Sequence, residues 1–198
     1  MAEKDLPIFR PTSQQHWREW LEAHHLTQQG VWLVYSKKKS IIPSLTWSEA
    51  VDEALCFGWI DSKAEPIDEH TYRQFFGPRK PKSGWSRVNK EKIQRLLAAD
   101  LMTPAGLASL ETAQQNGSWA LLDEVEALRI PADLEQAFRA KPTAATYFAA
   151  LSRTDKRNLL QWLVLARRPE TRQNRLTEIV ESAEQQLKPK QFRSRKQA

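Results

Sequence analysis

The first hundred residues alternate between hydrophobic patterns typical of helices and of strands. Apolar residues recur at helical spacing over residues 13–25. A β-branched and aromatic run at residues 31–35 predicts a strand, and residues 60–67 and 72–76 predict two more around a turn. The pattern therefore predicts a small sheet with packed helices rather than a series of alternating parallel strands and helices.

A second helix has the clearest start and stop signals in this region. Thr46 and Glu49 form a capping box, in which each side chain accepts a hydrogen bond from the other residue's amide. The apolar stripe that follows leaves Asp52 and Glu53 facing away from the core. Gly58 stands where a left-handed cap usually ends a helix, so we expect the helix to stop there.

From Ser86 to Leu187 the pattern is helical throughout. Val88 and Ile93 flank Asn89 as a hydrophobic staple, which predicts Asn89 as an N-cap. Prolines mark several later helix starts, because the first helical position needs no amide hydrogen. We expect these helices to start near Pro104, Pro131, Pro142, Thr154 and Pro169.

Together these patterns predict an α+β fold, with a small N-terminal sheet and packed helices followed by a helical C-terminal part. We place the α+β unit at residues 1–100, the helical part at residues 101–187 and a disordered basic tail at residues 188–198. No linker is long enough to separate two independent domains, so we expect the helical part to pack on the α+β unit as one compact body.

The composition is that of a folded globular chain. Hydrophobic residues make up 40% of the 198 residues, with eight tryptophans, whereas disordered chains are poor in aromatic residues. No apolar run reaches the roughly 20 residues that span a bilayer. The first residues are acidic and contain Pro7 instead of the basic and apolar stretches of a secretory signal. We therefore expect a cytoplasmic protein without a membrane partner.

The net charge of +6 is unevenly distributed. Residues 188–198 carry +5 and residues 77–95 carry +6, which leaves −5 on the remainder. Basic runs are common solvated surfaces, and we interpret the tail in this way. Nucleic-acid binding through the two basic patches stays an alternative that we do not expect, and the oligomeric state is left open.

The basic loop after residue 78 is the strongest candidate for a ligand site. Its cations precede a glycine that permits close backbone approach and then a helix N-terminus, whose free amides favour anions. Its tryptophan offers a ring for stacking, although no phosphate-binding glycine motif is present. A phosphate or carboxylate site and a solvated loop anchored by Trp85 explain the pattern equally well. The candidate binding residues are Arg79, Lys80, Lys82, Ser83, Gly84, Trp85 and Asn89.

Trp59 and Asp61 follow the glycine turn and are expected to contribute to the same pocket. A carboxylate at position 61 could bind a ligand amine or act as a base. A structural ion pair between Asp61 and Arg79 or Lys82 accounts for it as well. The expected partner is accordingly a small anionic ligand, with a protein partner as the other choice.

Three further residues are weaker candidates. Cys56 lies near a helix C-terminus, which raises a thiol pKa, so we interpret it as a buried small hydrophobe rather than a nucleophile. Arg172 and Arg175 lie at the edge of an apolar helix face and could bind an anion or pair with acids on a neighbouring helix. An unassigned enzyme that uses Asp61 or Cys56 stays an alternative to a binding protein.

No pattern points to a metal ion or a cofactor. The four histidines lack the HExxH spacing, and a single cysteine excludes both a CxxC motif and an intrachain disulfide. We therefore expect neither a metal site nor a cofactor.

Six segments of the chain are recognisable, at residues 9–11, 17–21, 30–34, 54–61, 78–89 and 168–172. They resemble the YdeI/OmpD-associated family, whose members are also called bacteriocin-protection proteins. The resemblance extends over nearly the whole chain and implies an α+β front with a helical C-terminal part. It also implies a bacterial protein linked to tolerance of bacteriocins or cationic antimicrobial peptides, and it supplies no catalytic residues. Since a basic protein repels cationic peptides, such protection would be indirect.

Overall fold

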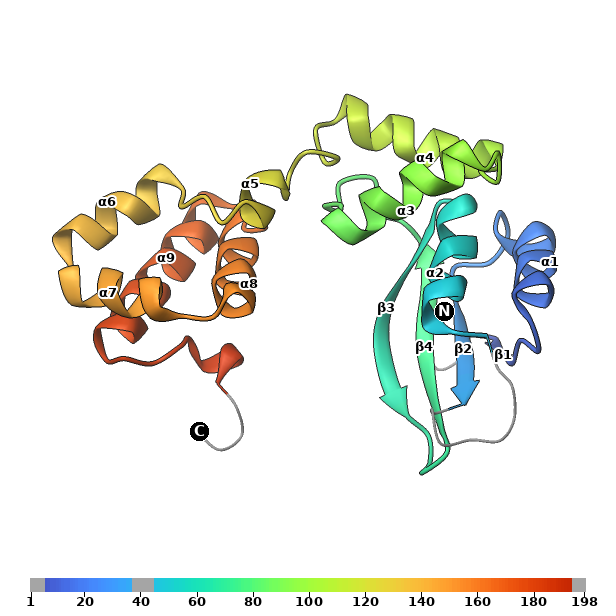
Figure 1. Ribbon diagram of the computed structural model, residues 1–198, viewed down its shortest axis with the longest axis horizontal. Helices are drawn as coiled ribbons and strands as arrows, with labels where there is room; N and C mark the ends of the chain where they lie inside the picture. Colours follow the sequence, from blue (N-terminus) through green and yellow to red (C-terminus); the bar gives the residue numbers. More distant parts are fainter. Residues whose placement is uncertain (1–5, 37–44, 194–198) are drawn as a thin grey trace. The chain divides into compact units, whose positions relative to one another are not determined.

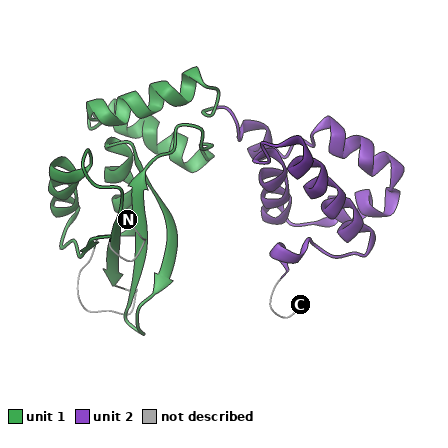
Figure 2. Ribbon diagram, turned by 180° about the vertical axis from the view of Figure 1, so that it is seen from behind, with its two compact units in different colours: residues 1–119 green, residues 120–198 purple. Residues whose placement is uncertain are grey.

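The computed structural model describes residues 6–36 and 45–193, which divide into two compact units (Figures 1 and 2). Unit 1 comprises residues 1–119 and contains the sheet, and unit 2 comprises residues 120–198 and is helical where it is described. The α+β class expected from the sequence is confirmed. A boundary at residue 100 and the packing of both parts into one body stay predictions.

Unit 1 is built around a mixed sheet. Its strands are β1 (Ile8–Phe9), β2 (Val31–Ser36), β3 (Trp59–Pro66) and β4 (Thr71–Pro78), in the order β1-β2-β4-β3. β1 runs parallel to β2, and the other neighbours are antiparallel. The three longer strands are those that the hydrophobic pattern predicts. β1 has only two residues, which is too few for a pattern to show.

Helices α1 (Gln14–His24) and α2 (Trp47–Cys56) enclose the core of unit 1 together with the sheet (Figure 1). The Trp17 indole is fully buried and donates a hydrogen bond of 3.1 Å to the Ala50 carbonyl, which joins α1 to α2. Large aromatic side chains dominate core energetics. Those that are fully buried in this core are Trp17, Tyr35, Trp59, Phe76 and Trp85.

The ends of α2 are as the sequence predicts. The capping box forms, with the Thr46 amide 2.8 Å from the Glu49 carboxylate and the Glu49 amide 3.2 Å from the Thr46 hydroxyl. Gly58 has a φ of +71°, the left-handed conformation that favours glycine. Local hydrogen bonding and backbone sterics are sufficient to set both ends.

The prediction that Asp52 and Glu53 face away from the core on α2 is wrong, because these residues are only 7% and 5% exposed. α2 contacts α1 as well as α3 (Arg87–Ala98), so its solvent-facing side is small. Glu53 accepts a hydrogen bond of 2.9 Å from Arg18 of α1. Asp52 pairs with cations of α3, as described in the Discussion. The acids of α2 are therefore internal links between helices.

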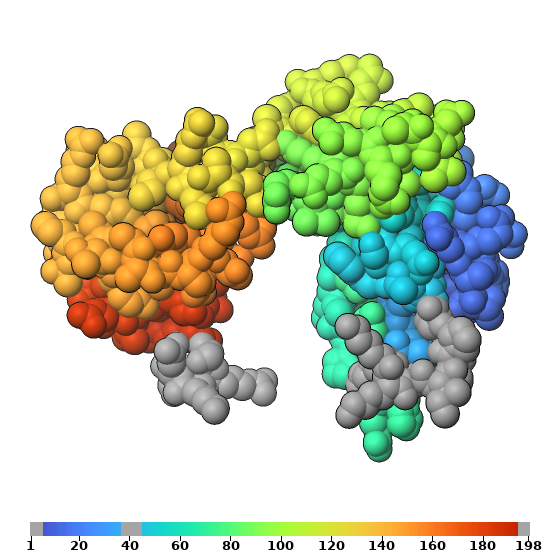
Figure 3. Space-filling model, in the orientation of Figure 1, coloured from blue at the N-terminus to red at the C-terminus, as the bar shows by residue number. Residues whose placement is uncertain are grey.

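The start of α3 also differs from the sequence prediction. Asn89 is not the N-cap; Ser86 is, with extended backbone and a hydroxyl that accepts the Asn89 amide at 3.3 Å. Both residue types can cap a helix, and the chain turns into the helix at the earlier one. The next helix, α4 (Pro104–Gln115), begins after Thr103 as predicted. Figure 3 shows α3 and α4 forming a continuous surface of unit 1.

Unit 2 has its own core of leucine, valine, isoleucine and phenylalanine side chains. The predicted starts near the prolines and Thr154 are confirmed, whereas α5 is a single turn that gives no periodic signal. The elements are α5 (Asp123–Glu126), α6 (Ala132–Ala140), α7 (Pro142–Ala150), α8 (Arg153–Val164), α9 (Pro169–Glu184) and the 3₁₀ turn η2 (Lys190–Phe192).

The first residues of the segment expected to be a disordered tail pack against unit 2. Lys188 forms an ion pair of 3.0 Å with Asp155, and the Phe192 ring lies edge-on to Trp162 at a centroid distance of 5.7 Å. An ion pair and an aromatic contact thus anchor this part of the basic stretch. Residues 194–198 lie outside the described residues.

Candidate functional site

Arg79 is the centre of the basic loop. It follows directly after β4, and its guanidinium carbon lies 3.6 Å from the centroid of the Trp85 ring. Its Nη2 donates a hydrogen bond of 2.6 Å to the Gly84 carbonyl. Trp85 is 2% exposed and packs beside Trp119 at a centroid distance of 5.1 Å. The chain thus folds back over residues 79–85, so that the cation lies over an indole ring.

Two nitrogens of this guanidinium have no partner. Arg79 Nε and Nη1 are buried and form no hydrogen bond. Burial lowers the pKa of the Arg79 guanidinium to about 10, and attraction by Asp61 opposes that change. Arg79 therefore stays charged at neutral pH, with two donors that neither solvent nor protein satisfies. Buried donors without a partner are rare in folded proteins, because each one costs about 1–3 kcal/mol.

The turn that covers Arg79 is itself well bonded. The Lys80 carbonyl accepts the amide and the hydroxyl of Ser83 at 2.9 and 2.8 Å. The Pro81 carbonyl accepts hydrogen bonds from Asn116 at 2.8 Å and from Ser118 at 3.0 Å, just after α4. The candidate residues from Arg79 to Trp85 are thus brought together in one compact turn.

Asp61 lies on β3, opposite Phe76 of β4. Its Oδ2 accepts hydrogen bonds from the Trp47 indole at 3.0 Å and from the Gln74 amide at 2.5 Å. The sequence allows an ion pair of Asp61 with Arg79 or Lys82. The hydrogen bonds that the structure shows at this carboxylate come from two neutral donors instead. Its negative charge nevertheless acts on Arg79. Asp61 is accordingly an electrostatic neighbour of the basic loop.

Two of the predicted site residues, Trp59 and Asn89, lie in surroundings different from those of the basic loop. The Trp59 ring is 1% exposed, and its indole donates to the His25 carbonyl at 3.3 Å, so it belongs to the core. Asn89 lies in the first turn of α3, where its amide completes the Ser86 cap. Neither residue is placed beside the Arg79 guanidinium by a contact that the structure shows.

Tyr35 is a polar residue at the sheet that the sequence gives no reason to select. Its hydroxyl is buried without a hydrogen-bond partner, and its ring stacks on Tyr72 at a centroid distance of 5.0 Å. Burial raises the pKa of the Tyr35 hydroxyl above its ordinary value, and Tyr72 and Asp61 add to the rise. The alternation within β2 places Tyr35 on the side of the buried Leu33, but only the cross-strand register pairs it with Tyr72.

Cys56, at the end of α2, has the environment of a structural residue. It is fully buried, and burial raises the pKa of its thiol to about 11, with Glu53 adding to the rise and Arg18 opposing it. A nucleophilic thiol needs a lowered pKa, so this environment opposes nucleophilic chemistry.

We expect the folded protein to protect Cys56 from alkylation. Its thiol pKa of about 11 leaves ~100-fold less thiolate at pH 8 than a thiol with the ordinary value near 9, and burial adds to the protection. Iodoacetamide labelling in buffer should thus be at least ~100-fold slower than in urea. Because unfolding releases this proton at a lower pH, stability should fall as pH rises from about 9 to 11. Equal labelling rates would contradict this environment.

Arg172 and Arg175 lie on α9 in unit 2. Arg172 forms a two-pronged pair with Asp133 of α6, at 2.7 and 3.0 Å, as the alternative considered from the sequence describes. Arg175 donates to the Trp162 carbonyl at 2.5 Å and lies 5.0 Å from the centroid of that indole ring. Both arginines therefore hold helices of unit 2 together.

Metal-ligating side chains do not cluster within residues 6–36 and 45–193, where no group of three or more His, Cys, Asp or Glu could hold an ion. None of the helices in the same ranges is long and apolar enough to cross a membrane.

Comparison with known families divides the chain in the same way as its structure. Residues 9–109, about half of the chain, match a domain of unknown function, DUF8412. The chain belongs to the DUF8412 family. Residues 127–186 match the family described as Bacteriocin-protection, YdeI or OmpD-Associated. No curated protein and no solved structure matches the chain.

The second match confirms the YdeI/OmpD-associated recognition, over a shorter stretch than the resemblance suggested. It covers most of unit 2 and includes the segment at residues 168–172. The segments at residues 54–61 and 78–89 lie within the DUF8412 match instead. The Arg79 site is thus part of the DUF8412 domain, and the YdeI/OmpD-associated part is the helical unit.

Proposed function

We propose that unit 1 of this DUF8412-family protein binds a small anionic ligand through Arg79. The observation that supports this function is the pair of buried guanidinium donors, Nε and Nη1, that have no partner. An ionised carboxylate or phosphate oxygen forms a strong, charge-assisted hydrogen bond with a guanidinium N–H group. A bound anion would accept from at least one of these two donors and balance the charge of the guanidinium.

Binding requires the turn at residues 80–84 to move, because the two donors are shielded from solvent. The Trp85 ring, 3.6 Å from the guanidinium carbon, holds this intrinsically planar group in place, so the ligand meets a preorganised cation. Asp61 lies close enough to act on Arg79 and has a half-exposed carboxylate. A ligand that also carries a hydroxyl or amine could use Asp61 as an acceptor.

The basic surface around this loop supports a small ligand more than it supports nucleic acid. Four of its cations are already engaged by groups of the protein: Arg79 is half-buried and lies over Trp85, Lys92 and Arg95 pair with Asp52, and Arg87 pairs with Glu91. The charge that remains for a phosphate backbone is therefore smaller than the sequence suggests. An enzyme that uses Cys56 as a nucleophile has no support in the raised pKa of its thiol.

The link to bacteriocin or antimicrobial-peptide tolerance is proposed to be indirect and to start in the cytoplasm. The chain carries a net charge of +6, which repels cationic peptides at long range. Protection by direct capture of such peptides is therefore disfavoured. An anionic metabolite or an acidic partner bound at Arg79 would connect the protein to that response.

The test is calorimetric titration of the full chain with inorganic phosphate and with malonate as probes. We expect saturable binding of at least one probe and a loss of affinity of about tenfold or more for Arg79→Lys, because a hydrogen bond to a charged group contributes about 1.5–3 kcal/mol. Urea unfolding of Arg79→Lys without the probe checks that the variant is folded, since it also loses the Nη2 bond to Gly84 and the stacking on Trp85.

Arg10→Gln is the matched control, because Arg10 is an exposed cation of unit 1 outside the candidate binding residues. It should change probe affinity by less than about twofold, as expected for a screened surface charge. Equal affinities of the parent and Arg79→Lys would refute the proposed function.

A further inference from the structure

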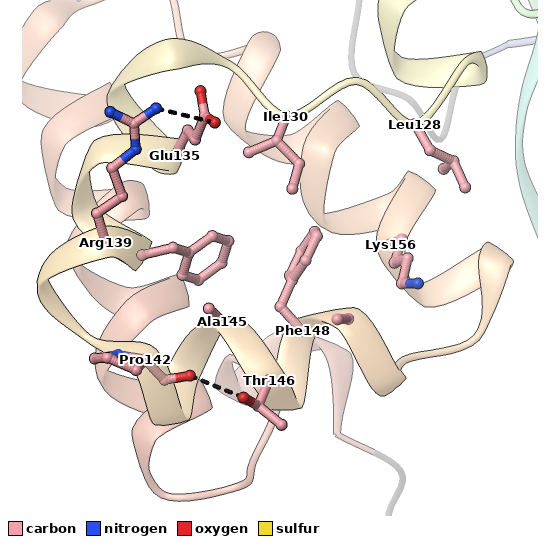
Figure 4. Close-up of a pocket in the computed structure, with 11 residues that line it drawn as sticks. Leu128, Ile130, Glu135, Arg139, Pro142, Ala145, Thr146, Phe148 and Lys156 are labelled. Carbon is pink, nitrogen blue, oxygen red and sulfur yellow. Dashed lines mark hydrogen bonds and ion pairs between the residues drawn. The ribbon is translucent and has the colours of Figure 1, made fainter.

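Unit 2 contains a hollow that the unit 1 site does not involve. It has a volume of about 640 Å³, within the range of small-molecule sites, and lies among α6, α7 and the start of α8 (Figure 4). Phe138 and Phe148, which are 6% and 3% exposed, form its inner wall and pack at a centroid distance of 5.1 Å. The other apolar lining residues are Leu128, Ile130, Pro142, Ala145 and Ala149.

The polar groups at the two ends of this hollow differ in net charge. At one end Arg139 is neutralised by Glu135, with 3.3 Å between nitrogen and oxygen, and Thr146 donates to the Pro142 carbonyl (Figure 4). At the other end stands Lys156 of α8, whose ammonium group forms no hydrogen bond or ion pair in the described part of the chain. The hollow is thus an apolar surface with one uncompensated positive charge at its edge.

Leu128 on the rim has a strained backbone. Its φ is +57°, at the position after α5 where glycine is the usual residue, and the Leu128 and Arg129 amides bond back to Val125 and Glu124 as in a helix C-cap. A leucine in this conformation costs about 1–2 kcal/mol. Such strain is concentrated at ligand sites, and here it places an apolar side chain at the Lys156 end of the hollow (Figure 4).

We infer that this hollow binds a single amphiphile with an apolar body and an anionic head group, with the body against Phe138 and Phe148 and the head group at Lys156. The apolar lining supplies the burial, and the uncompensated ammonium selects the charge of the head. A cationic amphiphile would have no partner there, since the only carboxylate lining the hollow is already paired with Arg139. The ligand is a free monomer, because the site is a small hollow within one unit.

The experiment titrates the full chain with decanoate, below its micellar concentration, and follows binding by calorimetry. We expect saturable binding of one decanoate, at least tenfold weaker binding of decyltrimethylammonium, and a loss of about tenfold in decanoate affinity for Lys156→Met. Ala149→Trp, an exposed position on the rim, should abolish binding by filling the hollow. Leu128→Gly should weaken binding with little change in unfolding temperature, because relief of the strain offsets the lost contacts.

Two controls separate this site from other causes. Lys190→Met removes an exposed cation outside the hollow and should leave decanoate binding unchanged. With excess phosphate present to occupy the Arg79 site, Arg79→Lys should also leave decanoate binding unchanged, so that failure of the unit 1 proposal is distinguishable from failure of this one. Equal affinity for both head-group charges, or binding only to vesicles of anionic lipid and not to monomeric decanoate, would overturn the inference.

Discussion

Asp52→Leu should destabilise the protein by about 3–5 kcal/mol, the cost of leaving a buried charge without its partner. Asp52 Oδ1 lies 2.7 Å from the ammonium of Lys92, and Oδ2 lies 2.7 Å from Arg95. Lys92 is 7% exposed and also donates to the Ser48 hydroxyl at 2.7 Å. Without the carboxylate, its charge stays buried against a single serine. Equilibrium unfolding in urea measures the loss, with the slope of the transition as a check that the unfolded state is unchanged.

Two control variants define what Asp52 does. The double variant Asp52→Leu/Lys92→Met replaces the pair by apolar groups and should recover stability to within about 1 kcal/mol of the parent protein. Arg95→Ala should cost less than about 1 kcal/mol, because the Arg95 side chain is 60% exposed and screened by water. A cost below about 1 kcal/mol for Asp52→Leu alone would show that Lys92 finds another partner.

Gly106→Ala should destabilise the protein by about 3 kcal/mol, even though alanine is the better helix former. The added methyl group would overlap the Cys56 carbonyl oxygen, a backbone atom that cannot rotate away. That same carbonyl accepts the Thr103 amide at 3.0 Å and the Thr103 hydroxyl at 2.7 Å, so any displacement of α4 weakens two hydrogen bonds. The gain in helix propensity is only about 1 kcal/mol.

The same urea measurement applies, with Ala108→Ser as the control. Ala108 is exposed on α4, so this substitution should change stability by no more than about 0.5 kcal/mol. If Gly106→Ala were neutral or stabilising, the close contact between α4 and the end of α2 would not be a constraint on the fold.

Helix ends and strands are what the sequence predicts well here. The capping box at Thr46, the left-handed Gly58 and the prolines that start α4, α7 and α9 all depend on neighbouring residues in the chain. The error at α3 has the same local origin, because Ser86 and Asn89 are both competent caps and periodicity does not choose between them.

The roles of the charged residues are what the sequence predicts poorly. Asp52 and Glu53 follow a polar pattern, yet both are buried, since a second and a third helix cover that face of α2. Lys92 and Arg95 count as a basic patch in the sequence, whereas the structure uses them to neutralise Asp52. Burial depends on which helices pack together, and no local pattern contains that information.

The candidate site likewise depends partly on local sequence signals and partly on tertiary packing. Residue types and spacing alone select the loop from Arg79 to Trp85 as a candidate place for an anion, and they select the α+β class; the resemblance to the YdeI/OmpD-associated family is confirmed over residues 127–186. Tertiary packing alone stacks Arg79 on Trp85, leaves Nε and Nη1 without partners, and assigns Trp59 to the core. The physical reason is that hydrogen-bond and helix-cap signals act between near neighbours, whereas desolvation and charge pairing are set by residues that meet only when the chain is folded.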